Sequence, residues 1–519
     1  MGKARCSRLL ALLLAATALS VGGCTGVREY VRNGFKVGPN YGPPEAPTAD
    51  RWIDEADQRV RSDSDVPTRW WTVFGDDVLN GLVERAASQN LSLREAGFRI
   101  LAARAQLGIV KGNFFPQQQD AVGTYARIAR PGTVISTKGF PVLPPPFAWP
   151  PYLNFANFYL EQWNFNFNLA WELDFWGRFR RAIASADATL DASVAGYDGV
   201  LVTLLADVAS NYVQVRTLQK RIELVRANVK LQQGIRNTAK RRFEAGARNE
   251  LDVAQAGSTL AQTEAQIPQS QIALREACTR LCILMGVPPA DLEKQLGERP
   301  IPVAPPEVVV GIPADLLRRR PDVRRAERIA AAQAEKIGIA QADFYPAIGF
   351  HGTLGWQANN FPELFSSHAF NSSAGPGFRW DLLNYGRILN NVRLQEAEFQ
   401  QLVASYQNTV LRANGEVEDA IVTFLRAQEA ARLLDRAVAN ALKAESIVAK
   451  QYKEGEIDFN RLTLIQQNLV QQQDFQTQAH GEIAQGLIQV YRALGGGWET
   501  PVWESPAEEA PAALPAANE

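Results

Sequence analysis

The sequence predicts a mainly α-helical protein that also contributes β-strands to a membrane. Three observations predict this fold class: duplicated, proline-free segments with a coiled-coil seam, a stretch in which aromatic and polar residues alternate strictly, and a signal-like N-terminus that ends at a cysteine. The 519 residues have an ordinary globular composition and a net charge of −1. So small a net charge gives no field for binding nucleic acid.

The N-terminus is typical of a secretory signal peptide, which we place at residues 1–23. Basic residues precede an apolar run, residues 9–19, that is too short to span a bilayer as a helix. Residues 21–24, Val-Gly-Gly-Cys, resemble the bacterial lipobox, with valine where leucine is commoner. We therefore expect a lipid on Cys24; the alternative is ordinary cleavage nearby, with Cys24 left as a thiol. Thr25 follows, where an aspartate would resemble an inner-membrane retention signal, so this pattern favours the outer membrane.

The chain is a tandem duplication. One shift of 209 positions superimposes landmarks over most of its length, and a shift of 230 superimposes residues 108–116 on residues 338–346. The difference of 21 residues marks a loop that is longer in the first copy. The landmarks related by the shift of 209 include Gly177 and Gly386, Gly246 and Gly455, and Gly286 and Gly495.

Each copy contains a long helix followed by a shorter one. The 68 residues between Gly177 and Gly246, and those between Gly386 and Gly455, contain no proline. At ~1.5 Å per residue such a helix is roughly 100 Å long. The apolar residues of both segments recur in steps of four and three, which is the coiled-coil period. A shorter helix returns after each turn glycine, and Pro268 is expected to kink the first. The sequence therefore predicts two helical hairpins with turns at Gly246 and Gly455.

Strict alternation over residues 163–175 predicts a β-strand with one aromatic face and one polar face. Dense aromatic residues opposite asparagines favour lipid on one side and water on the other. Earlier partner strands are predicted near residues 117–134 and 347–357. The proline-rich connection 139–157 is interpreted as an external loop with no room for a helix or a ladder. In the second copy the corresponding strand is formed around Phe378, Trp380 and Leu382.

Four strands per chain require an assembly. A bilayer tolerates no open sheet edge, and the smallest single-chain barrels have about eight strands. Two copies would give eight strands with a filled interior, whereas three would give twelve and an aqueous lumen. The strand count alone favours three copies only weakly.

Chemistry at a catalytic or metal site is not indicated. The three histidines, His351, His368 and His480, are scattered without ligand spacing, and no nucleotide motif is present. Cys278 and Cys282 lie one helical turn apart, where a disulfide would close almost no loop and would be strained. We interpret them as two small buried apolar residues, and we expect neither a metal nor a cofactor.

The sequence resembles the TolC-like outer-membrane factors, most closely the lipid-anchored ducts of RND-type multidrug efflux (NodT-type), over nearly the whole mature chain. The most specific matching segments are residues 37–41 (Val-Gly-Pro-Asn-Tyr), 70–79 and 311–323. Within the last, the Arg-Arg-Arg-Pro-Asp run by itself is interpreted as a solvated basic turn with Pro321 at the first position of the next helix.

This resemblance implies a homotrimer with a twelve-stranded β-barrel, a twelve-helix periplasmic α-barrel tunnel and an equatorial belt. Its implied partners are outer-membrane lipid, a periplasmic adaptor (membrane fusion) protein and an inner-membrane RND-type transporter. The implied function is passive conduction of small molecules to the exterior, without enzymatic activity and without a cofactor other than the covalent lipid on Cys24.

The resemblance also assigns residues at the ends of the two hairpins. The tip motifs for adaptor docking match Phe243, Gly246, Tyr452 and Gly455. The closable periplasmic gate corresponds to Tyr452, Asp458, Gln466 and Asp252. Close relatives carry an acidic residue where this chain has Gln466, so we expect a weaker, hydrogen-bonded closure there. The two glycines are also expected to have a purely structural role, in which each ends its helix in a left-handed cap.

The expected domains follow the two repeats. They are a signal peptide (1–23), a lipidated linker with an equatorial segment (24–75), the first repeat (76–286), an equatorial linker (287–313), the second repeat (314–496) and a disordered tail (497–519). Two rival functions stay open. One is a duct of the same fold for type I secretion or metal export, and the other is a non-conducting periplasmic coiled-coil lipoprotein, against which the aromatic strand argues.

Overall fold

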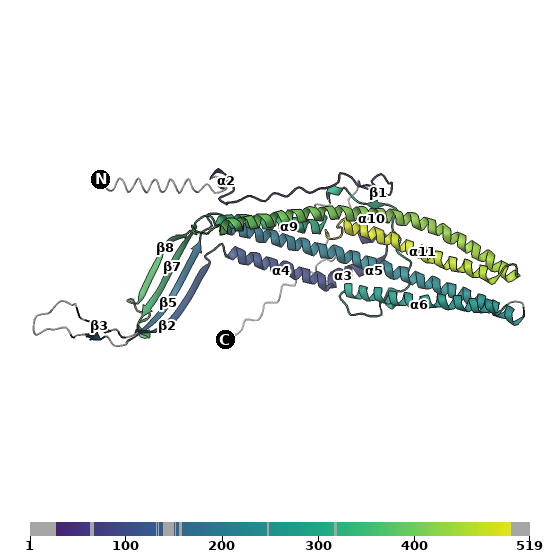
Figure 1. The fold of residues 1–519 in the computed structure, drawn as a ribbon, viewed down its shortest axis with the longest axis horizontal. Helices are drawn as coiled ribbons and strands as arrows, with labels where there is room; N and C mark the ends of the chain where they lie inside the picture. The colour runs from purple at the N-terminus through teal and green to yellow at the C-terminus, as the bar shows by residue number, and fades with distance from the viewer. Residues whose placement is uncertain are drawn as a thin grey trace, which may run out of the picture. The chain divides into compact units, whose positions relative to one another are not determined.

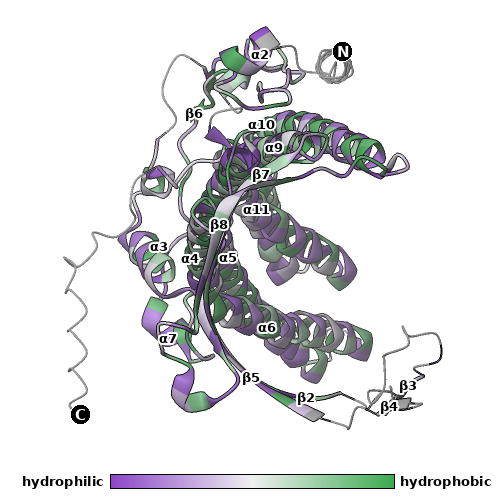
Figure 2. Cartoon of the chain, turned by 90° about the vertical axis from the view of Figure 1, so that its left-hand side faces the viewer, coloured by the Kyte–Doolittle hydropathy of each residue, from purple (hydrophilic) through white to green (hydrophobic). Residues whose placement is uncertain are grey.

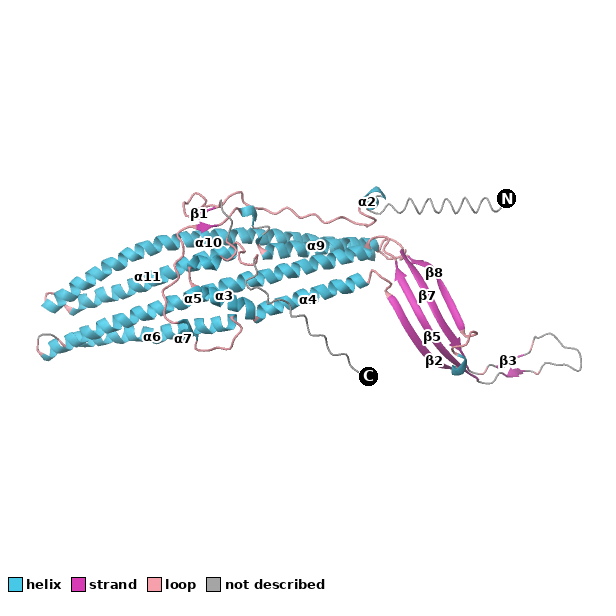
Figure 3. Ribbon diagram, turned by 180° about the vertical axis from the view of Figure 1, so that it is seen from behind, coloured by secondary structure: helices cyan, strands magenta, loops and turns pink. Residues whose placement is uncertain are grey.

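A computed structural model describes residues 27–62, 67–130, 132, 134–136, 138, 150, 152–154, 158–246, 249–315 and 319–499. They form long helices and a small antiparallel sheet (Figure 1; Figure 3). The chain divides into two compact units, each of which draws on both repeats. Unit 1 comprises the residues up to 42, 104–188 and 331–400, and unit 2 comprises 43–103, 189–330 and those from 401 onward. The domain boundaries drawn along the repeats stay a prediction.

The predicted long hairpins are confirmed. Helix α5 (Arg178–Glu244) has 67 residues and α10 (Arg387–Glu454) has 68, and their return helices α6 (Glu250–Leu284) and α11 (Phe459–Ala493) have 35 each. Helix α6 runs on through Pro268. The other described helices are α2 (Val27–Arg32), α3 (Asp77–Gln89), α4 (Leu91–Gly112), α7 (Leu292–Leu296) and α9 (Pro321–Ala342), with short 3-10 turns η1 (Trp70–Phe74), η2 (Pro313–Asp315) and η3 (Phe361–Glu363).

The sheet in unit 1 has the order β2-β5-β7-β8 and is antiparallel throughout. Its strands are β2 (Gln118–Arg130), β5 (Phe158–Glu172), β7 (Ala347–Ala358) and β8 (Phe370–Arg379). Within the described residues, β2 and β8 have no neighbour along their outer edges. The four strands predicted from alternation are therefore present, with two open edges.

The two faces of this sheet differ as the alternation predicts. On one face the rings of Tyr125 and Trp163 lie 4.4 Å apart, and those of Phe165 and Trp356 lie 6.4 Å apart. On the other face the Asn168 amide donates to Asp120 (2.7 Å) and accepts from the hydroxyl of Thr353 (3.2 Å). Cross-strand pairs of one kind on each face stabilise the register, because a slip of one residue would exchange the two faces.

Three details of the strand predictions are wrong. Strand β5 ends at Glu172 because the chain turns at Phe175, whose N–H donates to the carbonyl of Leu173. Strand β8 ends at Arg379, so Trp380 and Leu382 lie beyond it, in a turn closed by the Leu382 N–H on the Trp380 carbonyl. The proline-rich connection 139–157 does contain a strand, β4 (Tyr152–Asn154), which pairs with β3 (Val134–Ser136) just before the connection. Strand β4 lies after the last proline, where backbone N–H groups are free to pair.

The N-terminal segment of unit 1 is pinned by a buried arginine. The side chain of Arg181 is fully buried, and it donates to the carbonyls of Val37 (2.6 Å) and Gly38 (2.7 Å) and to Glu335 (2.7 Å). A Cβ on Gly338 would lie 2.2 Å from the Arg181 side chain. Arg181 therefore fixes the backbone of Val37 and Gly38 to unit 1.

The core of unit 2 is built on two adjacent tryptophans. Trp70 and Trp71 are fully buried, and Trp70 stacks on Tyr491 of α11 with ring centroids 5.6 Å apart. The helices carry apolar and polar residues side by side (Figure 2). One described helix, α5, has a window long and apolar enough to cross a membrane, but half of that window is buried, as in the core helix of a soluble protein. The short strands β1 (Val60–Arg61) and β6 (Val308–Val309) pair in parallel.

Two further predictions in unit 2 need correction. Pro321 begins α9 as predicted, but the preceding Arg320 is only 7% exposed, because its guanidinium donates to the Ala493 carbonyl (2.7 Å) and pairs with two carboxylates. The basic turn is therefore buried at its last residue. The tail predicted to be disordered from 497 is ordered at Trp498, whose indole N–H donates to the Arg319 carbonyl (2.9 Å).

Candidate functional site: the two hairpin tips

Each hairpin turns at a glycine in the left-handed region. Gly246 has φ +67° and Gly455 has φ +87°, and their N–H groups donate to the carbonyls of Phe243 (2.9 Å) and Tyr452 (3.1 Å). A residue with a side chain adopts this conformation only with strain, so glycine is required at each turn. The expected cap role of both glycines is confirmed.

The two hairpins share one apolar cluster near their tips. We call it the tip cluster; it is separate from the main core of unit 2. Tyr452 is its largest member, only 1% exposed, with its ring edge-on to Phe459 at 5.7 Å. Because the cluster takes residues from all four helices, its burial holds the hairpins together. Its buried members are Ala239, Ala256, Val448, Tyr452, Phe459 and Leu462.

Arg242 joins the first hairpin to the second. Its guanidinium donates to the backbone carbonyls of Tyr452 (2.6 Å) and Lys453 (2.5 Å) at the end of α10. It also lies over the Tyr452 ring, 4.7 Å from the centroid. The last carbonyls of a helix have no partner within the helix and carry partial negative charge, so a cation is favoured there. We call these contacts the Arg242 clamp.

The sequence did not single out Arg242. A basic residue in the last turn of α5 suits that helix's own C-terminus, and nothing in the sequence indicates that it reaches across to another helix. Only the pairing of the two tips, which places α5 beside the end of α10, identifies its partners.

The four predicted gate residues take different positions at the tips. Tyr452 is inside the tip cluster, and Asp458 is the N-cap of α11, accepting from the N–H of Arg461 at 2.9 Å. Gln466 is 4% exposed and donates to Glu445 of α10 at 3.5 Å, within its own hairpin. Asp252 is half-buried in the first turn of α6. The structure thus brings Tyr452 to the inter-hairpin contact, while Asp458 and Gln466 bond within the second hairpin.

The predicted docking residues are partly on the surface. Phe243 is 43% exposed, and a Cβ added to Gly246 or to Gly455 would meet nothing within 4 Å. Tyr452, in contrast, is buried. Docking at the tips stays a prediction, in which Phe243 and the two turns supply the accessible surface. The predicted lipidation residue, Cys24, lies outside the described residues.

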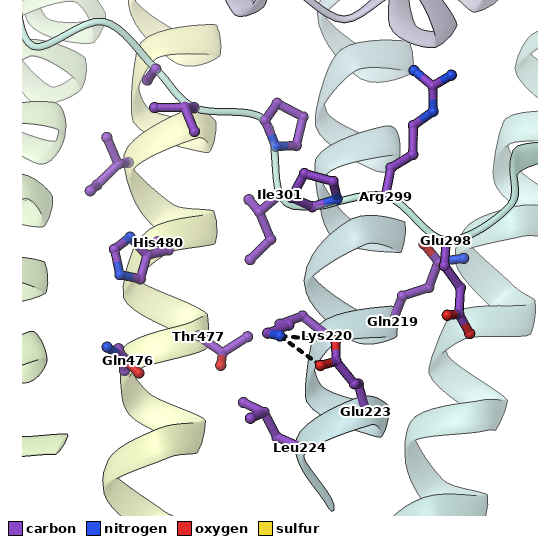
Figure 4. A pocket seen from close by; sticks show the side chains of 15 residues that line it. Gln219, Lys220, Glu223, Leu224, Glu298, Arg299, Ile301, Gln476, Thr477 and His480 are labelled. Atoms are coloured by element: carbon purple, nitrogen blue, oxygen red, sulfur yellow. Dashed lines mark hydrogen bonds and ion pairs between the residues drawn. The ribbon is translucent and has the colours of Figure 1, made fainter. Parts of the chain in front are cut away.

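Unit 2 also contains a cleft of about 600 Å³. It lies between α5, α11 and the segment from Glu298 to Ala304 (Figure 4). Among its lining residues, Lys220 pairs with Glu223 at 2.8 Å, and His480 bonds to Asp435 at 3.0 Å. No described group of three or more His, Cys, Asp or Glu could hold a metal ion.

The two predicted structural thiols are confirmed. Cys278 and Cys282 are free and buried in the core of unit 2. Burial raises the pKa of the Cys278 thiol to about 11. A thiol with so high a pKa is a poor nucleophile at neutral pH.

Comparison with known proteins agrees with this geometry. The family model described as "Outer membrane efflux protein" matches residues 82–287 and 312–496. Nodulation protein T of Rhizobium leguminosarum bv. viciae is 30% identical over 469 residues, which is 90% of this chain and 91% of that protein. A probable efflux pump outer membrane protein of Pseudomonas putida, TtgC, is 28% identical over 497 residues, 94% of this chain and 95% of its own.

A solved structure shares the fold. The outer-membrane channel OprN superimposes with a TM-score of 0.80 at 32% identity, and the match covers 89% of this chain and 99% of that one. Two long hairpins and a small antiparallel sheet are thus common to both. The chain belongs to the outer membrane efflux protein family, and it is an outer-membrane transport channel rather than an enzyme.

Proposed function

We propose that this protein is the outer-membrane duct of a tripartite efflux pump, in which three copies form one continuous passage. The sheet of unit 1 carries the proposal: it has an aromatic face, a polar face and two unpaired edge strands in the described chain. In a bilayer those edges must be paired. Three chains would supply twelve strands, enough for a water-filled barrel, and their hairpins would supply the twelve helices of a tunnel.

The N-terminal anchor is part of the proposal. A lipid on Cys24 would hold the chain to the membrane surface, and the residues that follow are fastened to unit 1 by Arg181. The lipid would assist assembly, because it keeps single chains at the membrane before they associate.

The partners are a periplasmic adaptor at the hairpin tips and an inner-membrane pump of the RND type. The exposed Phe243 and the two glycine turns are the accessible part of the tips, which supports their use for docking. An adaptor can open the passage only as far as it binds the open state more tightly than the closed one. The Arg242 clamp and the tip cluster are the contacts that opening would break, with Asp252, Asp458 and Gln466 beside them.

The experiment is conductance of the full-length protein in planar bilayers, together with its mass in detergent. We expect a trimer with a small resting conductance that rises when the tips are loosened. A particle that is a single chain at every concentration would overturn the trimer. A trimer that conducts nothing, even after the tips are loosened by substitution, would support a structural lipoprotein without a pore.

A further inference from the structure

The junction between the sheet and the long helices occurs twice in unit 1, once per repeat, and the two junctions differ in burial. Trp176 precedes Gly177 and helix α5 in the first repeat, and Tyr385 precedes Gly386 and helix α10 in the second. The two glycines have nearly the same φ, +80° and +81°. Trp176 is half-buried, however, whereas Tyr385 is 95% exposed. The backbone is therefore alike at both junctions, but the aromatic ring of the second is uncovered in the described chain.

The ring of Trp176 is covered by the beginning of the second repeat. It stacks on Tyr345 with ring centroids 4.5 Å apart, and its indole N–H donates to the carbonyl of Pro346 (2.9 Å). Both partners lie between α9 and β7, and the equivalent of Tyr345 in the first repeat is Phe115, which is 63% exposed. One aromatic pair is thus formed between the repeats, while Tyr385 and Phe115, which correspond to the two halves of such a pair, are both exposed.

A charged residue beside each ring follows the same pattern. Arg178 pairs across the repeats with Asp343 at 3.6 Å. Its equivalent, Arg387, pairs within its own repeat with Asp381 at 3.5 Å, and its side chain is 75% exposed. The counterpart of Asp343 in the first repeat is Asn113, which is also exposed. A guanidinium can donate to the oxygen of an amide as well as to a carboxylate, so Arg387 and Asn113 are chemically suited to each other.

A glycine marks the closest approach of the helices at this seam. A Cβ on Gly338 of α9 would lie 2.2 Å from the side chain of Arg181 of α5, so the second repeat requires glycine there. The equivalents are Gly108 of α4 and Asn390 of α10, and both are exposed. A Cβ on Gly108 would meet no described atom within 4 Å. Glycine destabilises a helix relative to alanine, and no contact within the described chain requires it at position 108.

We propose, on the basis of the trimer proposed above, that the seam between two copies repeats the seam between the two repeats of one chain. The first turns of α10 in one copy lie on the end of α4 in the next, with Tyr385 stacked on Phe115 and Asn390 against Gly108. The occupant of the exposed surface is therefore a second copy of this chain. Because two different surfaces meet, the contact is of the head-to-tail kind, which closes into a ring when its rotation allows.

A disulfide between copies tests the seam. Gly108→Cys and Asn390→Cys are combined in the full-length protein, in a background where Cys278→Val and Cys282→Ala remove the buried thiols. The equivalent side chains would touch in the second repeat, so oxidation should join copies through this pair. We expect most of the protein to run as cross-linked dimers and trimers on a denaturing gel. The background without the introduced cysteines reports any cross-linking through Cys24.

The matched control combines Asn390→Cys with Gln106→Cys. Gln106 is exposed on the same helix as Gly108, but its equivalent in the second repeat, Lys336, stays exposed, so Gln106 faces away from the seam. This pair should remain monomeric on the gel. The mass in detergent is measured before oxidation. A trimer in which the Gly108 pair cross-links no better than the Gln106 pair would overturn the seam and leave the trimer standing, whereas a single chain at every concentration would overturn both.

The aromatic contact is tested by substitution at Tyr385. Tyr385→Ala should raise the protein concentration at which half of the trimer dissociates in detergent by about tenfold, because a buried aromatic pair is lost at each seam. Tyr385→Trp introduces the residue that the first repeat has at this position, so it should leave association at the wild-type level. Unchanged association of Tyr385→Ala would overturn the stacking of Tyr385 on Phe115.

Discussion

The first and second hairpins are copies of one sequence, yet equivalent residues at their tips differ in burial. Phe243 is 43% exposed, whereas Tyr452, which lies 209 positions later, is 1% exposed. The helices around them match in length to within one residue. Duplication has therefore kept the scaffold while the two tips have diverged.

The caps and the cross-hairpin contacts differ in the same way. Asn249 begins α6 without a side-chain cap bond, whereas Asp458 caps α11. Arg242 reaches from the first tip to the second, and its equivalent in the second copy is Gln451. The comparison teaches that the second tip is the anchored one, with the first tip held against it. Each of the following predictions tests one part of that asymmetry.

The largest expected effect is loss of the buried tyrosine. Tyr452→Ala removes the largest side chain of the tip cluster, and buried aromatic-to-alanine changes cost about 3–5 kcal/mol. The local free energy of opening at the second tip should fall by that order, seen as faster hydrogen–deuterium exchange around residues 445–465. Phe243→Ala, at the equivalent position, should change exchange at the first tip by less than about 1 kcal/mol. Equal losses at both tips would contradict the asymmetry.

The next effect is release of the Arg242 clamp. Arg242→Gln removes the charge from two hydrogen bonds to carbonyls at the end of α10, and hydrogen bonds to charged groups contribute about 1.5–3 kcal/mol each at most. Since the guanidinium is partly exposed, we expect the free energy that holds the two hairpin tips together to fall by about 2 kcal/mol. Single-channel conductance in planar bilayers should rise.

Arg241→Gln is the control for this substitution. Arg241 is the exposed neighbour of Arg242, and its replacement by glutamine makes the same change in net charge. Its conductance should stay at the wild-type level. A rise of the same size in both variants would mean that net charge, and not the clamp, governs the passage.

A smaller effect is expected at the helix caps. Asp458→Ala removes an oxygen that accepts from the Arg461 N–H, and loss of such a cap costs about 1 kcal/mol. Asn249→Ala removes a side chain that makes no cap bond, so it should cost only a few tenths. Exchange of the first-turn amides of α11 and α6 measures both. Similar changes in exchange at α11 and α6 would show that helix capping does not contribute to the asymmetry between the two tips.

Much of the fold is visible in the sequence because it depends on local pattern. Proline-free runs bounded by glycine predict α5 and α10 closely, since helix ends follow backbone chemistry that proline and glycine control. Alternation predicts β5, since side-chain direction reverses at every strand residue. The end of β5 at Glu172 was not predicted, because the aromatic residues continue past the strand. The turn at Phe175 depends on a backbone hydrogen bond that the alternation does not reveal.

The candidate site is less predictable because it depends on which elements meet. The turn glycines are found from their spacing, but the burial of Arg320 and the reach of Arg242 depend on helices that lie distant in the sequence. A basic residue near a turn is usually solvated, and the sequence carries no sign of the carbonyls that each of these two arginines binds. The ordered Trp498 was missed for the same reason, since its partner, Arg319, lies 179 residues away.

The smallest expected effect concerns the base of the hairpins, where the first copy has Cys278 and the second has Leu487, both buried. Because the Cys278 pKa is raised to about 11, its thiolate is scarce at neutral pH and grows only as the pH approaches that value. In a Cys282→Ala background, iodoacetamide should leave Cys278 unmodified in the folded protein at pH 7.5 and modify it after unfolding, as measured by mass spectrometry of the peptide that contains Cys278. Cys278→Val should change the free energy of unfolding by less than about 1.5 kcal/mol, as a volume-conserving apolar swap does. Rapid modification of Cys278 in the folded protein at pH 7.5 would show that this position is accessible, and that the two copies differ at their base as well as at their tips.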